Sequence, residues 1–115
     1  MLSFSSQQRY FLYRSATDMR KGFNGLYGHV TEHMQLKPLN GALFVFTNKA
    51  RNRVKLLHWD GSGLWVMAKR LEEGRFSWPK SATDARKLRL GSTALSMLLD
   101  GIELKDGAKK AWYDA

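Results

Sequence analysis

Two strand-like segments around a short turn sequence most strongly constrain the fold of this 115-residue chain. The segments are RVKLLHW (53–59) and LWVMAKRL (64–71), and DGSG (60–63) lies between them. Aspartate followed by glycine is a frequent turn sequence in β-hairpins, and the flanking apolar, aromatic and β-branched residues are typical of strands. The sequence therefore predicts an antiparallel hairpin in the middle of the chain.

Three further segments indicate strands on either side of this hairpin. ALFVFT (42–47) is apolar at every position except the last, as expected of a strand that is buried on both faces. It predicts a three-stranded antiparallel meander together with the hairpin. RYFLYR (9–14) is typical of a strand between polar flanks, and KLRL (87–90) indicates a short strand near the C-terminus.

Two helices are predicted from apolar periodicity and from their end signals. The first has Thr17 as a candidate N-cap and ends before Pro38. Its apolar residues recur every three or four positions and are Met19, Phe23, Leu26, Val30 and Met34. The second helix is expected to begin at Ser92 and to stop at Gly101.

These elements predict one small α+β domain that spans residues 1–115. The expected order is strand, helix, three-stranded antiparallel meander, short strand and helix. The core is expected at about residues 9–104, with a polar tail at 105–115 and a polar loop after Pro79. A chain of this length is suited to one modest hydrophobic core.

The charge of the chain is strongly positive and is concentrated in its middle. Nineteen lysines and arginines oppose ten acidic residues, which gives a net charge of +9 and an isoelectric point near 10.1. Between Lys49 and Arg89 there are eleven cations and four acids, a local net charge of +7. This balance favours a polyanionic partner, of which nucleic acid is the commonest, although solubility alone is the alternative explanation.

Several classes of protein are disfavoured by what the sequence lacks. There is no cysteine, so disulfides and thiolate metal sites are excluded, which suits a reducing cytoplasm. The N-terminal residues do not resemble a signal peptide, and no apolar segment approaches the roughly 18 residues needed to cross a bilayer. We therefore expect a cytoplasmic protein without a membrane partner.

One segment of the first predicted helix matches a metal-binding pattern. His29, Glu32 and His33 fit H-x-x-E-H, in which two histidines one turn apart share a zinc ion. Only three positions are fixed in this pattern, and these residues also suit the polar margin of an amphipathic helix. His58 is expected to be a packed side chain on a strand. We therefore predict neither a metal nor any other cofactor.

The acidic residues do not indicate a catalytic site. Asp60 is explained by the turn, Asp18 and Asp100 by helix ends, and Glu72 and Glu73 by neighbouring cations. Neither a phosphate-binding G-x-x-x-x-G-K-[ST] sequence nor a nucleophile G-x-S-x-G sequence is present. The chain is therefore predicted to be no enzyme, without catalytic residues and without a small-molecule substrate.

Cations and aromatic residues on and near the middle strands are the candidate binding residues. Lysines and arginines on adjacent strands would neutralise phosphates and release counterions. The predicted nucleic-acid-binding residues are Arg20, Lys21, Arg51, Arg53, Lys55, Lys69, Arg70 and Arg75. Trp59, Phe76 and Trp78 are possible stacking or interface aromatics, and the alternative for Phe76 and Trp78 is that they pack under the domain.

Three blocks of the sequence together resemble a known family. They are TDMRKGFNGL (17–26), LFVFTNKARNRVKLLHWDGSGLWVMAKRLEEGRFSWP (43–79) and ALSMLLDGIEL (94–104). They are similar to the small accessory protein, called transposase B or Orf2-like, of the insertion-sequence sixty-six family of bacterial transposons. The resemblance runs from about Tyr10 to Leu104, whereas residues 80–90 and the tail beyond Leu104 depart from it.

The resemblance implies an auxiliary role in transposition beside a separate transposase that carries the catalytic carboxylates. One hypothesis is a non-catalytic protein that binds DNA through its basic residues and is associated with the nucleoid when bound. The other is a protein–protein interaction module that docks on the transposase or on a sister accessory protein without touching DNA. In the second case Trp65, Met67, Phe76 and Trp78 would be interface residues.

Overall fold

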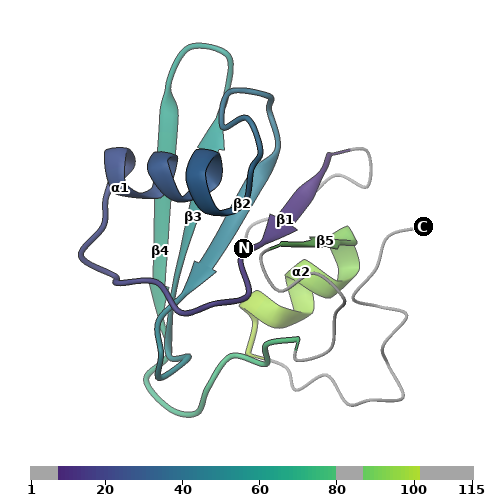
Figure 1. Cartoon of the computed structure of the whole chain (residues 1–115). Coiled ribbons are helices and arrows are strands. Elements are labelled where there is room, and N and C mark those ends of the chain that lie inside the picture. Colours follow the sequence, from purple (N-terminus) through teal and green to yellow (C-terminus); the bar gives the residue numbers. More distant parts are fainter. Residues whose placement is uncertain (1–7, 80–86, 102–115) are drawn as a thin grey trace.

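The computed structural model describes residues 8–79 and 87–101, so the predicted loop at 80–86 and tail at 105–115 lie outside it. The described residues form five strands, two α-helices and one π-helical turn. In chain order these are β1 (Tyr10–Leu12), α1 (Phe23–Gly28), η1 (His29–His33), β2 (Leu43–Thr47), β3 (Arg53–Trp59), β4 (Leu64–Arg70), β5 (Leu88–Leu90) and α2 (Ser92–Leu99). The predicted α+β fold and its order of elements are confirmed (Figure 1).

All five strands belong to one mixed sheet with the order β4-β3-β2-β1-β5. β1 runs parallel to β2, and the other neighbouring strands are antiparallel. The predicted hairpin is present, with Trp59 opposite Leu64 at its closed end. There the carboxylate of Asp60 accepts the backbone N–H groups of Ser62 and Gly63, at 2.9 Å each. β2 is the central strand, as its apolar sequence predicts, and all its residues are buried.

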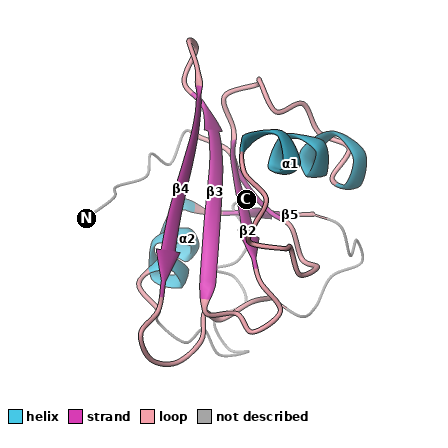
Figure 2. Cartoon of the chain, turned by 90° about the vertical axis from the view of Figure 1, so that its left-hand side faces the viewer, coloured by secondary structure: helices cyan, strands magenta, loops and turns pink. Residues whose placement is uncertain are grey.

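The sheet separates two hydrophobic clusters because successive side chains of a strand point to opposite faces. Figure 2 shows α1 on one side of the strands and α2 on the other. On the α1 side, Leu26 and Val30 pack with Phe44, Phe46 and Leu57. The α1 side therefore holds one continuous core between the helical segment and the middle strands.

The α2 side of the sheet holds the other cluster. Leu95 and Leu98 of α2 pack with Leu12, Val45 and Leu56, and each of these is at most 3% exposed. Two aromatic residues of the loop after β4, Phe76 and Trp78, belong to the same cluster. The sequence after β4 thus returns under the sheet and does not continue as a strand.

The first helix begins later than the sequence predicts. Thr17 is no N-cap, because Gly22 occupies that position; the backbone N–H of Thr17 instead donates to the carbonyl oxygen of Thr47 at 2.7 Å and extends the contact of β1 with β2. The helix starts at Phe23, after Gly22. From His29 it becomes π-helical, and the N–H of Met34 donates to the carbonyl oxygen of His29 at 3.0 Å.

Candidate nucleic-acid interface

The turn between β2 and β3 is organised by one asparagine. The side-chain oxygen of Asn48 accepts the backbone N–H groups of Asn52 and Arg53, at 3.1 Å each. Its side-chain nitrogen donates to the side-chain oxygen of Asn52 at 2.7 Å. Arg51 adopts a left-handed conformation, with φ of 59°. These bonds hold Arg51 and Arg53 at one end of the sheet.

The loop after β4 is bound to this turn through the backbone. The N–H of Leu71 donates to the carbonyl oxygen of Asn52 at 2.8 Å, and the N–H of Phe76 donates to that of Arg51 at 2.6 Å. Between Leu71 and Phe76, Gly74 has a φ of 78°, a backbone conformation that residues other than glycine rarely adopt. The loop therefore brings the exposed Arg75 to the same end of the sheet as Arg51.

Arg53 and Arg70 lie directly opposite each other at the open end of the β3–β4 hairpin, and both are exposed. Like charges in this position are destabilising. Arg70 Nη2 lies 3.1 Å from Glu72 Oε1, but these side chains are 67% and 79% exposed, so the ion pair is weak. Within residues 8–79 and 87–101, Arg53 forms no ion pair.

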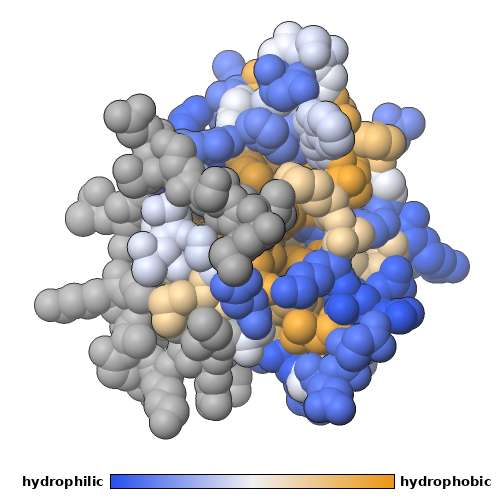
Figure 3. Space-filling view, turned by 180° about the vertical axis from the view of Figure 1, so that it is seen from behind, coloured by the Kyte–Doolittle hydropathy of each residue, from blue (hydrophilic) through white to orange (hydrophobic). Residues whose placement is uncertain are grey.

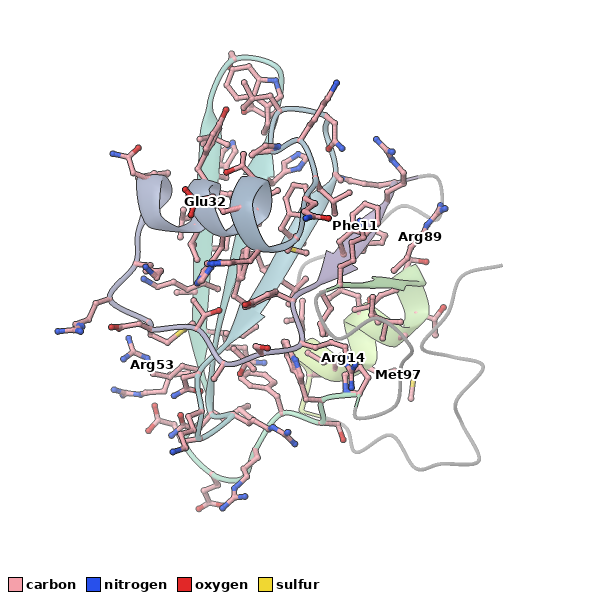
Figure 4. The ribbon with its side chains drawn as sticks, in the orientation of Figure 1. Phe11, Arg14, Glu32, Arg53, Arg89 and Met97 are labelled. Atoms are coloured by element: carbon pink, nitrogen blue, oxygen red, sulfur yellow. The ribbon has the colours of Figure 1, made fainter. Side chains whose placement is uncertain are left out.

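We call this group of residues the cationic end. Its members come from the β2–β3 turn, the start of β3, the end of β4 and the following loop. Figure 4 shows Arg53 at this end of the sheet and Arg89 on the other side of the molecule. The cationic end consists of Lys49, Arg51, Arg53, Arg70 and Arg75.

An open pocket of about 500 Å³ adjoins the cationic end, and we call it the side pocket. It lies between the segment before α1 and the β2–β3 turn. Its lining residues are Ala16, Thr17, Asp18, Met19, Arg20, Asn48, Lys49, Ala50 and Arg53. Hydrogen bonds from the side chain and then the backbone of Arg20 lower the pKa of Asp18 to about 2. The side pocket therefore combines three cations with one carboxylate that stays ionised.

Two predicted binding residues, Lys69 and Lys55, use their side-chain nitrogens in contacts within the fold. Lys69 lies on the α2 face of β4, away from Arg70, and its Nζ donates to the carbonyl oxygen of Leu99 at 2.6 Å. Lys55 is half-buried and its Nζ donates to the carbonyl oxygen of Lys21 at 2.8 Å. Lys69 therefore does not share a face of the sheet with Arg53 and Arg70, because strand neighbours alternate between faces.

The candidate aromatic residues are distributed between the core and the hairpin. Phe76 is 1% and Trp78 is 5% exposed, and Trp78 Nε1 donates to the carbonyl oxygen of Tyr13 at 3.2 Å. Their rings pack in the core and are not open to stacking with bases. Trp59 is half-buried near the closed end of the hairpin, whereas Trp65 is 57% exposed.

His29 and His33 form a pair on η1, with their Nδ1 atoms 2.5 Å apart. The ring of Tyr13 lies against both, at centroid distances of 5.1 and 6.2 Å. Burial, followed by the neighbouring His33, lowers the pKa of His29. Among the described residues no group of three or more histidine, aspartate or glutamate side chains could hold a metal ion. In the part of the chain that the structure describes, no helix is long and apolar enough to span a membrane.

Sequence reasoning did not select two residues that the structure places at this site. Lys49 lies in the turn between two predicted strands, where only its charge pointed to binding. Thr17 was predicted as a helix cap, yet it lines the side pocket, and its Oγ1 is buried without a hydrogen-bond partner. The contact between the segment at Thr17 and the β2–β3 turn is tertiary, and no local pattern indicates it.

Residues 8–109 match the family described as IS66 Orf2-like protein. The chain belongs to this family. It is thus an IS66 Orf2-like transposition accessory protein, as the three sequence blocks indicate.

Two relatives of this IS66 Orf2-like protein come from Sinorhizobium fredii. The uncharacterized protein y4hO is 38% identical over 103 residues, which cover 90% of this chain and 88% of the relative. The uncharacterized protein y4jC is 32% identical over 103 residues, which cover 90% and 86%. No solved structure matches the chain.

Proposed function

We propose that this IS66 Orf2-like protein binds DNA through its cationic end, as a non-catalytic accessory of the separate transposase of its element. The observation that carries the proposal is the placement of Arg53 opposite Arg70. This pair costs stability, and Glu72 compensates it only weakly because both side chains of the ion pair are solvated. A phosphate backbone would supply the missing negative charge.

Electrostatics further supports the proposal. Lysines and arginines that contact phosphates release condensed counterions, so affinity falls with rising salt. The cationic end presents its charges on a turn, two strand ends and a loop that are tied together by backbone hydrogen bonds. Because these bonds fix the backbone that carries the cations, less conformational entropy of the backbone is lost when a polyanion binds.

The test is the affinity of wild-type and variant protein for a duplex oligonucleotide, measured by fluorescence anisotropy across a salt series. Arg53→Thr removes one cation and retains good strand propensity. We expect weaker binding and a shallower plot of log affinity against log salt, by about 0.9 for one lost phosphate contact. Arg70→Thr should behave similarly.

Arg89→Thr is the matched control. Arg89 is an exposed cation on the edge strand β5, on the other side of the molecule (Figure 4). It carries the same charge in the same type of secondary structure, so its loss should leave the salt dependence close to that of the wild type. Equal effects of Arg53→Thr and Arg89→Thr would show that net charge, and not the cationic end, governs binding.

Docking on the transposase or a sister accessory protein is the second candidate function. Trp65 is 57% exposed on β4, an edge strand of the sheet, and Met67 on the same face is half-buried. The view from behind shows apolar residues near the centre of this face, bordered by hydrophilic residues above, below and to the right (Figure 3). Co-purification with the transposase after nuclease treatment, lost in Trp65→Ala but not in Arg53→Thr, would favour this function.

A further inference from the structure

We infer that the side pocket accommodates one unpaired nucleotide, so that the protein prefers single-stranded DNA or a single-stranded overhang to blunt duplex. This inference rests on the proposed function, because it assumes that DNA lies along the cationic end. It goes beyond that function by assigning a distinct role to residues 16–20 and 48–50. The role follows from the size, walls and charge of the side pocket.

The side pocket is large enough for a small ligand. Its volume of about 500 Å³ falls within the range of roughly 300–1,000 Å³ that is usual for such sites. Ala16, Met19 and Ala50 give it apolar walls, and Met19 is fixed because it packs in the α1-side core. Apolar walls are of little use to a bare phosphate but suit the faces of a base.

Cations at the side pocket are placed to contact the phosphate and the base of such a nucleotide. Arg53 and Lys49 belong to both the side pocket and the cationic end, so a strand bound at that end passes the pocket. The Nε and Nη2 atoms of Arg20 donate to the carboxylate of Asp18 at 2.7–3.1 Å. The Arg20 side chain is 91% exposed, so the face of its guanidinium is open to stacking with a base.

An unsatisfied hydroxyl group is the independent observation. Thr17 is 3% exposed, lines the side pocket, and has no hydrogen-bond partner for Oγ1. A buried polar group without a partner is costly and calls for an explanation. A base has donors and acceptors on its edge, and one of these would provide the missing partner for Thr17 Oγ1.

Only an unpaired nucleotide can use the side pocket in this way. A base inside a duplex is stacked and paired, and its removal from the helix costs a few kcal/mol. A base in a single strand or an overhang is already free of its partner. The side pocket should therefore add affinity for single-stranded segments and none for blunt duplex.

The experiment compares three probes with the full chain: a single-stranded oligonucleotide, a blunt duplex, and the same duplex with a short overhang. Ala50→Phe fills the side pocket at an exposed turn position without a change of charge. We expect Ala50→Phe to weaken binding of the single strand and the overhang by roughly fivefold or more, the usual contribution of one stacked base. Blunt-duplex affinity and its salt dependence should be unchanged.

Thr93→Phe, at an exposed position of α2, is the matched control and should change none of the three affinities. Equal affinity of the wild type for the three probes, or equal losses for all probes in Ala50→Phe, would overturn the inference while the proposed function stands. Absence of binding to every probe would overturn the proposed function itself. The two failures are therefore distinguishable.

A second measurement separates a nucleotide site from a simple anion site. The probes are thymidine 5′-monophosphate and inorganic phosphate, followed through the backbone amide chemical shifts of residues 16–20 and 48–53. The inference predicts that the nucleotide shifts these amides at lower concentration than phosphate does. Equal shifts at equal concentrations would show that the base makes no contact and would contradict the inference.

Discussion

Lys69 and Arg70 are adjacent in the sequence, yet their side chains lie on opposite faces of β4. Arg70 faces the α1 side of the sheet and belongs to the cationic end. Lys69 faces the α2 side, where its Nζ lies 2.6 Å from the carbonyl oxygen of Leu99 at the last turn of α2. The last carbonyl groups of a helix lack intrahelical partners and carry a partial negative charge. Lys69 therefore stabilises the fold.

The first prediction concerns this division of roles. Lys69→Met retains most of the apolar length of the side chain and removes the charge at the end of α2. We expect a loss of about 0.5–1 kcal/mol in the free energy of unfolding, because the ammonium group is partly solvated. DNA affinity should stay close to that of the wild type. Urea denaturation and the anisotropy salt series measure the two quantities.

Arg70→Met is the matched variant and should give the reverse result, with nearly unchanged stability and a weaker, less salt-dependent complex. Its ion pair with Glu72 is exposed and so contributes little to folding. A Lys69→Met protein that keeps its stability but loses DNA affinity as Arg70→Met does would contradict this assignment.

Strand periodicity predicts that Lys69 and Arg70 point to opposite faces of β4. It does not indicate which face is covered by which helix, because that depends on packing between distant segments. The same limit applies to Phe76 and Trp78, whose spacing suits either exposed stacking residues or core residues. Their burial is decided by the return of the loop under the sheet, which is fixed by backbone bonds to Arg51 and Asn52.

At the level of elements, the hairpin and β2 were predictable and the first helix was only partly so. Turn chemistry and apolar alternation are local signals, and they indicate β2, β3 and β4 nearly to the residue. The helix that periodicity predicts from Met19 begins at Phe23, because the preceding segment instead extends along β2 through Thr17. The parallel pairing of β1 with β2 and the antiparallel pairing of β1 with β5 have no local signature.

The π-helical turn η1 leads to a prediction about pH. His29 is packed against Tyr13 and Phe46 and lies beside His33, and burial lowers its pKa. The folded state therefore binds its proton less readily than the unfolded chain, in which the pKa is near 6.5. Because the unfolded state takes up more protons, stability should fall as the pH drops below about 6.5.

Urea denaturation at pH 7.5 and pH 5.5 tests this expectation. The wild-type protein should be less stable at the lower pH, and His29→Gln should lose part of that difference because glutamine does not titrate. His33→Gln is the matched control at the exposed member of the pair. The expectation fails if His29→Gln loses as much stability on acidification as the wild type.

At the level of the whole molecule, α1 and α2 lie on opposite faces of the sheet, and the cationic end lies at one end of it. The cationic end is the place where the β2–β3 turn meets the loop after β4. Its arginines could be selected from the sequence because their charge is concentrated in the middle of the chain. The side pocket could not, since the contact of Thr17 with Thr47 that joins its two walls is tertiary.

The central claim is that DNA contacts the cationic end, and mapping of the contact surface tests it most directly. The measurement is a titration of isotope-labelled protein with a duplex oligonucleotide, followed by backbone amide chemical shifts. Our account predicts that the largest changes occur at residues 48–53 and 70–75. Changes confined to α2 or to the closed end of the β3–β4 hairpin, with none at the cationic end, would contradict it.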